Sequence, residues 1–333
     1  MTIINTSVSR LLAIAVASGL CMTATMLHAQ SPAQAYPNQT ITFIVPYAAG
    51  GSSDTRSRQL AQKLSTSLGV SVVIENKPGA SGNIGTGQIA RAKPDGYTIG
   101  LGNFAPIAVN DSLYTLNFKP VSDLAPIALI ERGPMVLGVG SNTYGDFDAL
   151  LKYGRANPGK LNYASTGAGS ASHLSTELLE SLAGFEATHV PYRGGAPASN
   201  DLIAGNVDFY VELPSLFLPH ATGDAPRIKL LAVASDKRVP GLPDTPTFEE
   251  LGIKGMVVSN WFGVVAPAGV SPDIIKTLNE HINRALQDPQ YRSVVESQGG
   301  EVAGGTPEQF KTFIASEAER WKALITKQNI TVQ

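Results

Sequence analysis

The stretch ITFIVPYAAGGSSDTRSRQLAQKLSTSLG, residues 41–69, joins three different local patterns. Residues 41–45 form an apolar run around one threonine, which favours a buried strand. Residues 50–53, GGSS, supply turn glycines and helix-capping hydroxyls. Leucines then recur at every fourth position before Gly69, as in an amphipathic helix with a glycine stop. The stretch therefore predicts a strand, a glycine-rich loop and a helix whose N-terminus can hold an anion.

The same alternation of apolar runs and helical patterns continues along the chain. Most of the runs are continuous rather than alternating, which favours strands that are covered on both faces. Two later helices begin with Ser271-Pro272 and Thr306-Pro307, which place a capping hydroxyl before a first-turn proline. Strand–helix alternation of this kind predicts an α/β fold with mainly parallel sheets. The further strand candidates cover residues 70–75, 97–102, 135–140, 161–165, 187–192, 207–212 and 228–235.

Eight strand candidates are too many for one small sheet, and the polar glycine-rich loops fall into two clusters. We therefore expect two lobes, each a doubly wound sheet with flanking helices. The chain is expected to cross between them near residues 122–132 and to return after Lys237, because PGLPDTPTF (240–248) is a proline-rich connection. The expected boundaries are residues 36–125 and 240–333 for lobe one and 126–239 for lobe two.

The first 29 residues have the composition of a cleaved export signal. Arg10 is their only charge, residues 11–27 are apolar and small, and cleavage is acceptable after Ala29 or Ala35. A retained membrane anchor is the competing interpretation, but serine, threonine and glycine dilute the apolar run below the roughly 20 residues that a span needs. Cys21, the only cysteine, leaves with the signal, so we expect a disulfide-free protein of the bacterial periplasm.

The sequence motifs of nucleotide-binding and hydrolytic enzymes do not match this chain. The glycines of GASGNIGTG (79–87) fit neither the dinucleotide fingerprint nor the phosphate-binding P-loop, and no G-x-S-x-G elbow occurs. The histidines lack metal-ligand spacing, so no metal and no cofactor is expected. A formal net charge of −2, without a basic run interleaved with aromatics, gives no reason to expect nucleic acid. A serine hydrolase built on Ser170 or Ser172 with His173 stays as the alternative.

Three loops follow predicted strands and open predicted helices. They cover residues 46–54, 165–173 and 191–201, and all three are rich in glycine, serine or both. In open α/β sheets the ligand lies at the carboxyl ends of the strands, where such loops gather. Backbone N–H groups, hydroxyls and helix N-termini are suited to holding a carboxylate. The loops therefore predict an anion site between the lobes.

These segments resemble those of the substrate-binding receptors of tripartite tricarboxylate transporters, the Bug or TctC family. The similar segments lie in the family's order and span most of the chain. They are VPYAAGGSSD (45–54), ENKPGASGNIGTGQIARAKPDGYT (75–98), YASTGAGSASHL (163–174), VPYRGGAPASNDLIAGNVDF (190–209), LPSLFLPH (213–220), IKLLAVASDKR (228–238) and FGVVAPAGVSPDII (262–275).

The resemblance implies a two-lobed, type II-like periplasmic binding fold that closes on an organic acid without catalysis. It implies a monomer that passes its ligand to a large and a small membrane subunit; signalling to a membrane kinase is the alternative. In the family, one loop from each lobe holds the carboxylate, largely through backbone groups. The residues that this places at the ligand are Tyr47, Ala48, Ala49, Gly50, Gly51, Ser52, Ser165, Thr166, Gly167, Ser170, Gly194, Gly195, Ala196 and Pro197.

Three further positions bear on which acid is bound. Arg193, where the family often has lysine, either pairs with a second carboxylate or lies solvated at the rim. Asn103 and Phe104 follow the third strand, and Phe104 either stacks on or narrows the site for the ligand, or fills the lobe core. On this basis we expect an aromatic carboxylate such as phthalate or terephthalate, with aliphatic di- or tricarboxylates as the alternative.

Three polar residues are expected to support the loops rather than touch the ligand. Asp54 complements the helix dipole or braces its loop, since a carboxylate there would repel an anion. His173 lies one turn into its helix and is expected to brace the second loop. Asp208 follows a strand start and is expected to brace the third loop.

Overall fold

The computed structural model describes residues 36–328, 330 and 331, and the expected signal peptide lies outside the described residues. Residues 39–333 form one compact unit, to which the following description refers. Within the described part, no helix is both long and apolar enough to cross a membrane.

Lobe one is built around a six-stranded sheet with the order β11-β4-β10-β3-β1-β2. β1 pairs in parallel with β2 and β3, whereas β10 runs antiparallel to both β3 and β4. Every residue of β1 except Thr42 is buried, as the apolar run predicts. The strands are β1 (Ile41–Val45), β2 (Val72–Asn76), β3 (Thr98–Asn103), β4 (Leu124–Pro134), β10 (Ser259–Pro267) and β11 (Glu301–Val302).

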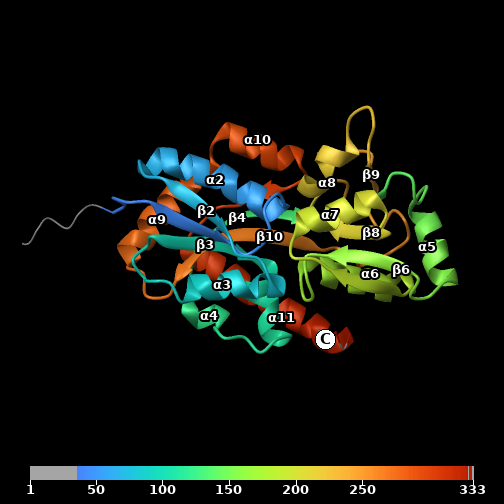
Figure 1. Cartoon of the computed structure of the whole chain (residues 1–333), viewed down its shortest axis with the longest axis horizontal. Coiled ribbons are helices and arrows are strands. Elements are labelled where there is room, and N and C mark those ends of the chain that lie inside the picture. Colours follow the sequence, from blue (N-terminus) through green and yellow to red (C-terminus); the bar gives the residue numbers. More distant parts are fainter. Residues whose placement is uncertain (1–35, 329, 332–333) are drawn as a thin grey trace, which may run out of the picture. The chain divides into compact units, whose positions relative to one another are not determined.

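Helices cover both faces of this sheet. Figure 1 shows α2, α9 and α10 on one face and α3, α4 and α11 on the other. The opening stretch folds as predicted: α2 buries Leu60 and Leu64 and ends at Gly69 in the left-handed conformation (φ 72°). The helical segments are α2 (Ser52–Leu68), η1 (Ala80–Gly82), α3 (Asn83–Ala90), η2 (Ala105–Val109), η3 (Asn110–Ser112), α4 (Pro120–Asp123), α9 (Pro272–Leu286), α10 (Pro289–Ser297) and α11 (Pro307–Gln328).

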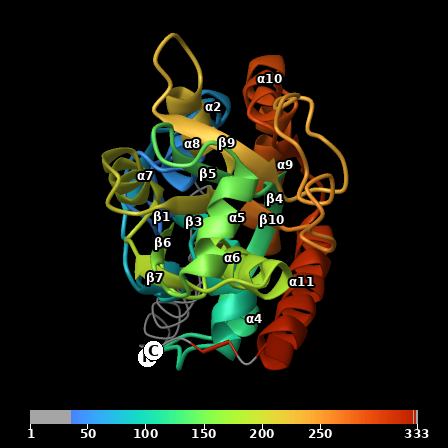
Figure 2. The ribbon, with the colours of Figure 1, turned by 90° about the vertical axis from the view of Figure 1, so that its right-hand side faces the viewer.

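Lobe two is built around a five-stranded sheet with the order β7-β6-β8-β5-β9. β6 pairs in parallel with β7 and β8, and β5 runs antiparallel to β8 and β9. In the view of Figure 2, α5 and α6 lie in front, α7 lies to the left of them and α11 of lobe one lies to the right. The elements are β5 (Val136–Gly140), α5 (Phe147–Ala156), β6 (Leu161–Ser165), α6 (Ala171–Ala183), β7 (Ala187–Pro191), α7 (Gly195–Ala204), β8 (Phe209–Glu212), α8 (Pro214–Ala221) and β9 (Ile228–Val233).

Three chain segments connect the lobes, and their backbones are hydrogen-bonded to one another. The N–H of Met135 donates to Val258, that of Val258 to Ala234, and that of Ala234 back to Met135, at 2.8–3.0 Å. The first crossing thus falls between β4 and β5, beyond the expected 122–132 segment, and the first sheet resumes at β10 rather than at residue 240. The three bonded segments form a compact hinge.

The two-lobed α/β architecture is confirmed, while the sheets are mixed rather than mainly parallel. β4 and β10 were not recognised as strands in the sequence. Their runs, LAPIALIERGP and SNWFGVVAP, contain prolines and polar residues that obscure a strand pattern. β10 re-enters its sheet from the opposite lobe, and β10 is therefore antiparallel to its neighbour β3.

Candidate functional site

The first loop is held open at the N-terminus of α2. Gly50 adopts φ 84°, which favours glycine, and its N–H donates to the Asp54 carboxylate at 2.9 Å. Arg58 and Asn76 donate to the same carboxylate. Burial raises the pKa of Asp54, but these three hydrogen bonds together hold it below its usual value. Asp54 therefore braces the loop as an anion. The N-cap residue of α2 is Gly51, so no side chain caps the first N–H groups of this helix.

The second loop is supported by its own hydroxyls. The Ser165 hydroxyl accepts the Gly167 N–H at 3.0 Å, and the Thr166 N–H donates to Ser172. Ser170 caps α6 by accepting the His173 N–H. The His173 ring accepts the Gly169 N–H at 3.0 Å, so His173 supports this loop from within.

The third loop meets the first across the lobes. The Ala48 N–H of lobe one donates to the Arg193 carbonyl of lobe two at 3.2 Å. A Cβ added to Gly51 would lie 3.3 Å from the Gly195 nitrogen, and only glycine at Gly194 adopts φ 153° beside Ala48 without crowding. The N-terminus of α7, like that of α2, has no side-chain cap. Two uncapped helix N-termini from opposite lobes therefore meet here.

A further contact between the lobes involves a turn that the sequence analysis did not place at the site. The Ser81 hydroxyl in η1 and the Tyr114 hydroxyl both donate to the Ala168 carbonyl of the second loop, the latter at 2.6 Å. Ala80 and Ser81 have φ of 47° and 52°, a conformation that is strained for non-glycine residues. Gly79 and Gly82, on either side of this pair, are the sequence signal for this turn.

Two cavities lie between the lobes, and both are lined by Tyr47 and Thr166. The inner cavity has a volume of about 20 Å³, enough for about one water. The outer cavity has a volume of about 200 Å³. The inner cavity is lined by Tyr47, Gly51, Ser52, Ser53, Asn103, Thr166, Gly195, Glu212 and Asn260. The outer cavity is lined by Tyr47, Gly79, Ala80, Ser81, Gly82, Tyr114, Thr166, Gly167, Ala168, Pro191, Tyr192 and Arg193.

A chain of buried hydrogen bonds forms one wall of the inner cavity. The Tyr47 hydroxyl donates to Asn103 at 2.6 Å, and Asn103 donates to Asn260 at 3.0 Å. The Tyr210 hydroxyl donates to Glu212 at 2.9 Å. Sequence reasoning missed Glu212 and Asn260, although a glutamate at the carboxyl end of an apolar strand is a signal for Glu212.

The predicted site residues divide into three groups. Eight line the cavities, four support the loops from within, and others form the contact between the lobes or the loop tip. The cavity-lining residues are Tyr47, Gly51, Ser52, Asn103, Thr166, Gly167, Arg193 and Gly195. The supporting residues are Asp54, Ser165, Ser170 and His173. Those that line neither cavity are Ala48, Ala49, Gly50, Gly194, Ala196 and Pro197.

Two expectations need correction. Phe104 is fully buried and packs edge-to-face on Trp321 at 4.8 Å between ring centroids, so its contacts support the alternative in which it fills the lobe core. Asp208 was expected to brace the third loop, which is wrong. It accepts the Asn162 N–H at 2.7 Å and the Tyr144 hydroxyl, at the N-terminal ends of β6 and β8. That end is opposite to the loops, because parallel strands share their carboxyl edge.

Arg193 is exposed and borders the outer cavity. No carboxylate of the described residues lies within ion-pair distance of its guanidinium, whereas its backbone carbonyl is used in the contact with Ala48. Its charge is therefore available to a ligand in the outer cavity.

The catalytic alternative does not assemble. The His173 ring bonds to the Gly169 N–H and the Glu177 carboxylate and not to the hydroxyl of Ser170 or Ser172, whose contact with His173 is the backbone cap of α6. A different serine–histidine hydrogen bond, between Ser165 and His189 at 2.6 Å, is present. Ser165 is fully buried, and burial together with the nearby His173 lowers the pKa of His189 to about 4, which makes it a weak base. Among residues 36–328, 330 and 331, no His, Cys, Asp and Glu side chains cluster as a metal site.

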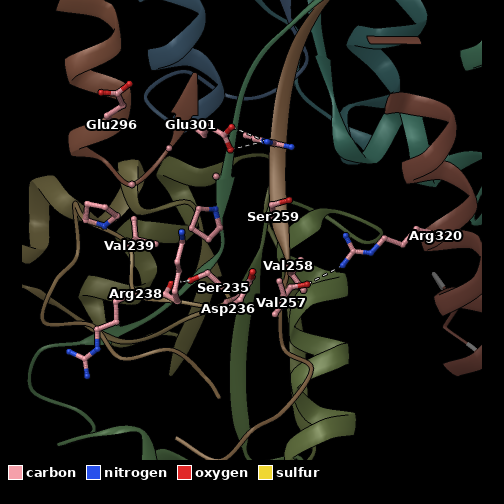
Figure 3. A pocket seen from close by; sticks show the side chains of 18 residues that line it. Ser235, Asp236, Arg238, Val239, Val257, Val258, Ser259, Glu296, Glu301 and Arg320 are labelled. Carbon is pink, nitrogen blue, oxygen red and sulfur yellow. Dashed lines mark hydrogen bonds and ion pairs between the residues drawn. The ribbon is translucent and has the colours of Figure 1, made fainter. Parts of the chain in front are cut away.

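A further cavity lies at the hinge and is a different kind of site. It has a volume of about 720 Å³ and shares no residue with the inner and outer cavities. Figure 3 shows Arg320 bonded to the Val257 backbone, at 3.0 Å. Arg132 makes a bidentate pair with Glu301 at 2.8 Å. Arg238, which also lines this cavity, pairs with Glu250, whereas Lys237 makes no ion pair among the described residues. No helix N-terminus lines the hinge cavity, which distinguishes it from the inner cavity.

Comparison with known proteins agrees with this geometry. The family model for the tripartite tricarboxylate transporter family receptor matches residues 57–330. BugT of Bordetella pertussis is 37% identical over 322 residues, which cover 96% of this chain and 97% of BugT. An R. palustris protein solved with adipate has a TM-score of 0.85 at 34% identity, covering 89% of this chain and 99% of that one. MatC from Rhodopseudomonas palustris, solved with bound malate, has a TM-score of 0.82 at 30% identity, covering 87% and 100%.

The similarity extends over nearly the whole chain in both sequence and structure. The periplasmic binding protein BugD has a TM-score of 0.84 at 36% identity, covering 90% of this chain and 100% of BugD. The family is one of substrate-binding receptors and not of enzymes. The chain belongs to the tripartite tricarboxylate transporter family receptors, as a Bug-type periplasmic solute-binding protein.

Proposed function

We propose that this protein captures a small organic carboxylate between its lobes in the periplasm and delivers it to the membrane subunits of a tripartite transporter. The observation that carries the proposal is the meeting of the uncapped N-termini of α2 and α7 at the inner cavity. Backbone N–H groups and the positive ends of two helix dipoles there favour an anion. Relatives solved with adipate and malate support the carboxylate class.

The ligand that we propose is a dicarboxylate. One carboxylate lies at the mouth of the inner cavity beside the helix N-termini, with the cavity itself holding about one water, and the other carboxylate reaches the guanidinium of Arg193 across the outer cavity. Arginine holds a carboxylate bidentately, and Arg193 has no competing carboxylate among the described residues. Because Phe104 packs in the lobe core, it cannot stack on the ligand and gives no reason to expect an aromatic one. Tyr114 and Tyr192 line the outer cavity, so terephthalate and phthalate stay candidates beside aliphatic diacids.

The experiment is a thermal-shift panel of acids on the mature protein. A ligand that binds only the folded state raises its melting temperature by mass action. We expect shifts with at least one of terephthalate, phthalate, adipate, malate or citrate. If amino acids or sugars shift the protein and no carboxylate does, the proposed function is wrong.

Arg193→Gln separates the two ends of the ligand. Loss of a charged partner from a bidentate pair costs about 1.5–3 kcal/mol, which is about a 10- to 100-fold rise in Kd. We expect this loss for a dicarboxylate and little change for the monocarboxylate of the same skeleton, measured by calorimetric titration. The matched control is Arg155→Gln, because Arg155 donates to the Ala183 carbonyl, away from both cavities. Equal losses for the two ligands would contradict the role of Arg193.

A further inference from the structure

Glu212 is a buried carboxyl in the inner cavity with no cation beside it. Its exposed fraction is 5%, and it lies at the carboxyl end of β8. One oxygen accepts the Tyr210 hydroxyl at 2.9 Å, and the other accepts the Leu213 N–H at 2.8 Å. No lysine, arginine or histidine in the described residues makes an ion pair with it; its remaining polar partner is the Asn260 amide.

The groups around Glu212 do not supply a charge to balance it. The titratable groups that face it are two phenols, Tyr210 on its own strand and Tyr47 from lobe one. The helices and strands packed on β8 direct their titratable groups to other partners. These are His173 with Gly169 and Glu177, Glu177 with Tyr163, Glu180 with Ala187, His189 with Ser165 and Asp201 with Tyr192.

The position of Glu212 conflicts with an anionic ligand unless the carboxyl is neutral. Gly51, Ser52 and Gly195, at the N-termini of α2 and α7, line the same small cavity. An ionised Glu212 would therefore face the ligand carboxylate without a screening cation, and two carboxylates that share a site do not both ionise readily. Burial already raises the pKa of Glu212, against opposing hydrogen bonds from Leu213, Tyr210 and Asn260.

We propose that Glu212 is protonated in the ligand-bound state and donates a hydrogen bond to the ligand's carboxylate or to the water between them, so that capture of the anion takes up one proton. The proton comes from solvent to a carboxyl oxygen of Glu212, and no bond of the ligand changes. This inference rests on the proposed function. Protonated Glu212 then favours the binding of carboxylates at low pH. The alternative, in which ionised Glu212 pairs with a cationic ligand, conflicts with the positive ends of the two helix N-termini.

The test is the pH dependence of binding, with terephthalate and adipate as probes, from about pH 6 to about pH 8.5, where both probes stay ionised. A ligand that takes up one proton loses up to about tenfold in affinity per pH unit above the pKa of free Glu212. We expect this fall for the native protein and a flat profile with tight binding at high pH for Glu212→Gln, which keeps the shape and a donor.

Glu180→Gln is the matched control, because Glu180 is another carboxyl of lobe two whose pKa burial raises, to about 8, and it lines neither cavity. We expect Glu180→Gln to keep the native pH profile. The same calorimetry in two buffers of different ionisation enthalpy counts the protons taken up by the native protein, without any variant. A count approaching one proton at high pH supports the proposal.

The outcomes separate this inference from the proposed function. If a probe binds with no proton uptake, or if Glu212→Gln keeps the native pH profile, the role of Glu212 is refuted and carboxylate capture stands. If Glu180→Gln flattens the profile, the proton belongs to Glu180 and the inference is also refuted. If neither probe nor any acid of the panel binds at any pH while a cationic amino acid does, both proposals fall.

Discussion

Gly167 has a conformation and a neighbourhood that no other residue type fits. Its φ is 126°, and a Cβ there would collide with Ser81 of the opposite lobe. Gly184, also in lobe two, has φ 69° but no atom within 4 Å of an added Cβ. Substitution of Gly184 therefore introduces backbone strain alone, whereas substitution of Gly167 introduces strain and a clash between the lobes.

We expect Gly167→Ala to weaken ligand binding at least about tenfold, because the added methyl group holds the lobes apart and costs the closed state more than about 1.4 kcal/mol. Gly184→Ala carries a similar strain of roughly 1–2 kcal/mol and is expected to lower the melting temperature while leaving the affinity unchanged. Calorimetric titration well below both melting temperatures measures this. Equal affinities for the two variants would show that Gly167 does not limit closure.

Glu180 predicts how the stability of lobe two changes with pH. Burial raises its pKa from 4.5 to about 8, with the neighbouring Glu177 as a further cause. A carboxyl with a raised folded-state pKa adds stability below its unfolded pKa, and this stability is lost as the pH rises through about 8. We expect the native melting temperature to fall between pH 5 and pH 8 and this fall to be smaller in Glu180→Gln. Glu249→Gln, at an exposed position, is expected to keep the native slope, and a Glu180→Gln slope equal to the native one would contradict the assignment.

At the residue scale, local chemistry could be read from the sequence and distant packing could not. Glycines and hydroxyls beside a predicted strand end identify Gly51 and Thr166, because the turn and the cap are local. Phe104 was placed at the ligand because its burial depends on Trp321, from the last helix of the chain. The place of Glu212 at the site could not be predicted, because its cavity forms only where the end of β8 in lobe two faces Tyr47 and Asn260 of lobe one.

At the scale of elements, η1 and the second loop form a latch between the lobes. Ser81 and Tyr114 converge on the single carbonyl of Ala168. These hydrogen bonds join the two lobes, and we propose that they are made in the closed state alone, so that their removal acts on that state. The strained φ angles of Ala80 and Ser81 are consistent with a turn whose shape is fixed by this contact.

We expect Tyr114→Phe to speed ligand release about 2- to 10-fold, because a hydrogen bond of this kind contributes about 0.5–1.5 kcal/mol. Stopped-flow displacement measures the release rate directly. Tyr144→Phe is the matched control, since its hydroxyl bonds to Asp208 at the other edge of the second sheet. Release rates that change equally in both variants would contradict the latch.

The elements that the sequence predicted well are those with continuous apolar runs between glycines, such as β1 and α2. β4 and β10 are not identified from the sequence because they are long, carry prolines and charged or polar residues, and pair with each other although the whole of lobe two separates them in the sequence. The mixed direction of the sheets has the same origin, since a strand that returns from the other lobe enters its sheet from the opposite edge. Pairing between segments far apart in the sequence leaves no local pattern.

At the scale of the whole molecule, the hinge and the site lie on different segments. The hinge is three hydrogen-bonded crossings at Met135, Ala234 and Val258, and the site is formed by loops at the facing strand ends. On the proposed function, a rotation about the hinge opens and closes the two cavities without unfolding either sheet. The proposed ligand would then join two helix N-termini that are already formed.

The most direct measurement is a calorimetric comparison of a diacid with its diamide, terephthalate against terephthalamide and adipate against adipamide. Each pair shares its shape and differs in charge, so it isolates the recognition of the ligand's carboxylates from that of its skeleton. We expect at least one diacid to bind with a Kd of about 10 μM or tighter and its diamide to bind at least about 100-fold more weakly. Equal affinities for acid and amide, or binding of the amides alone, would contradict the carboxylate site.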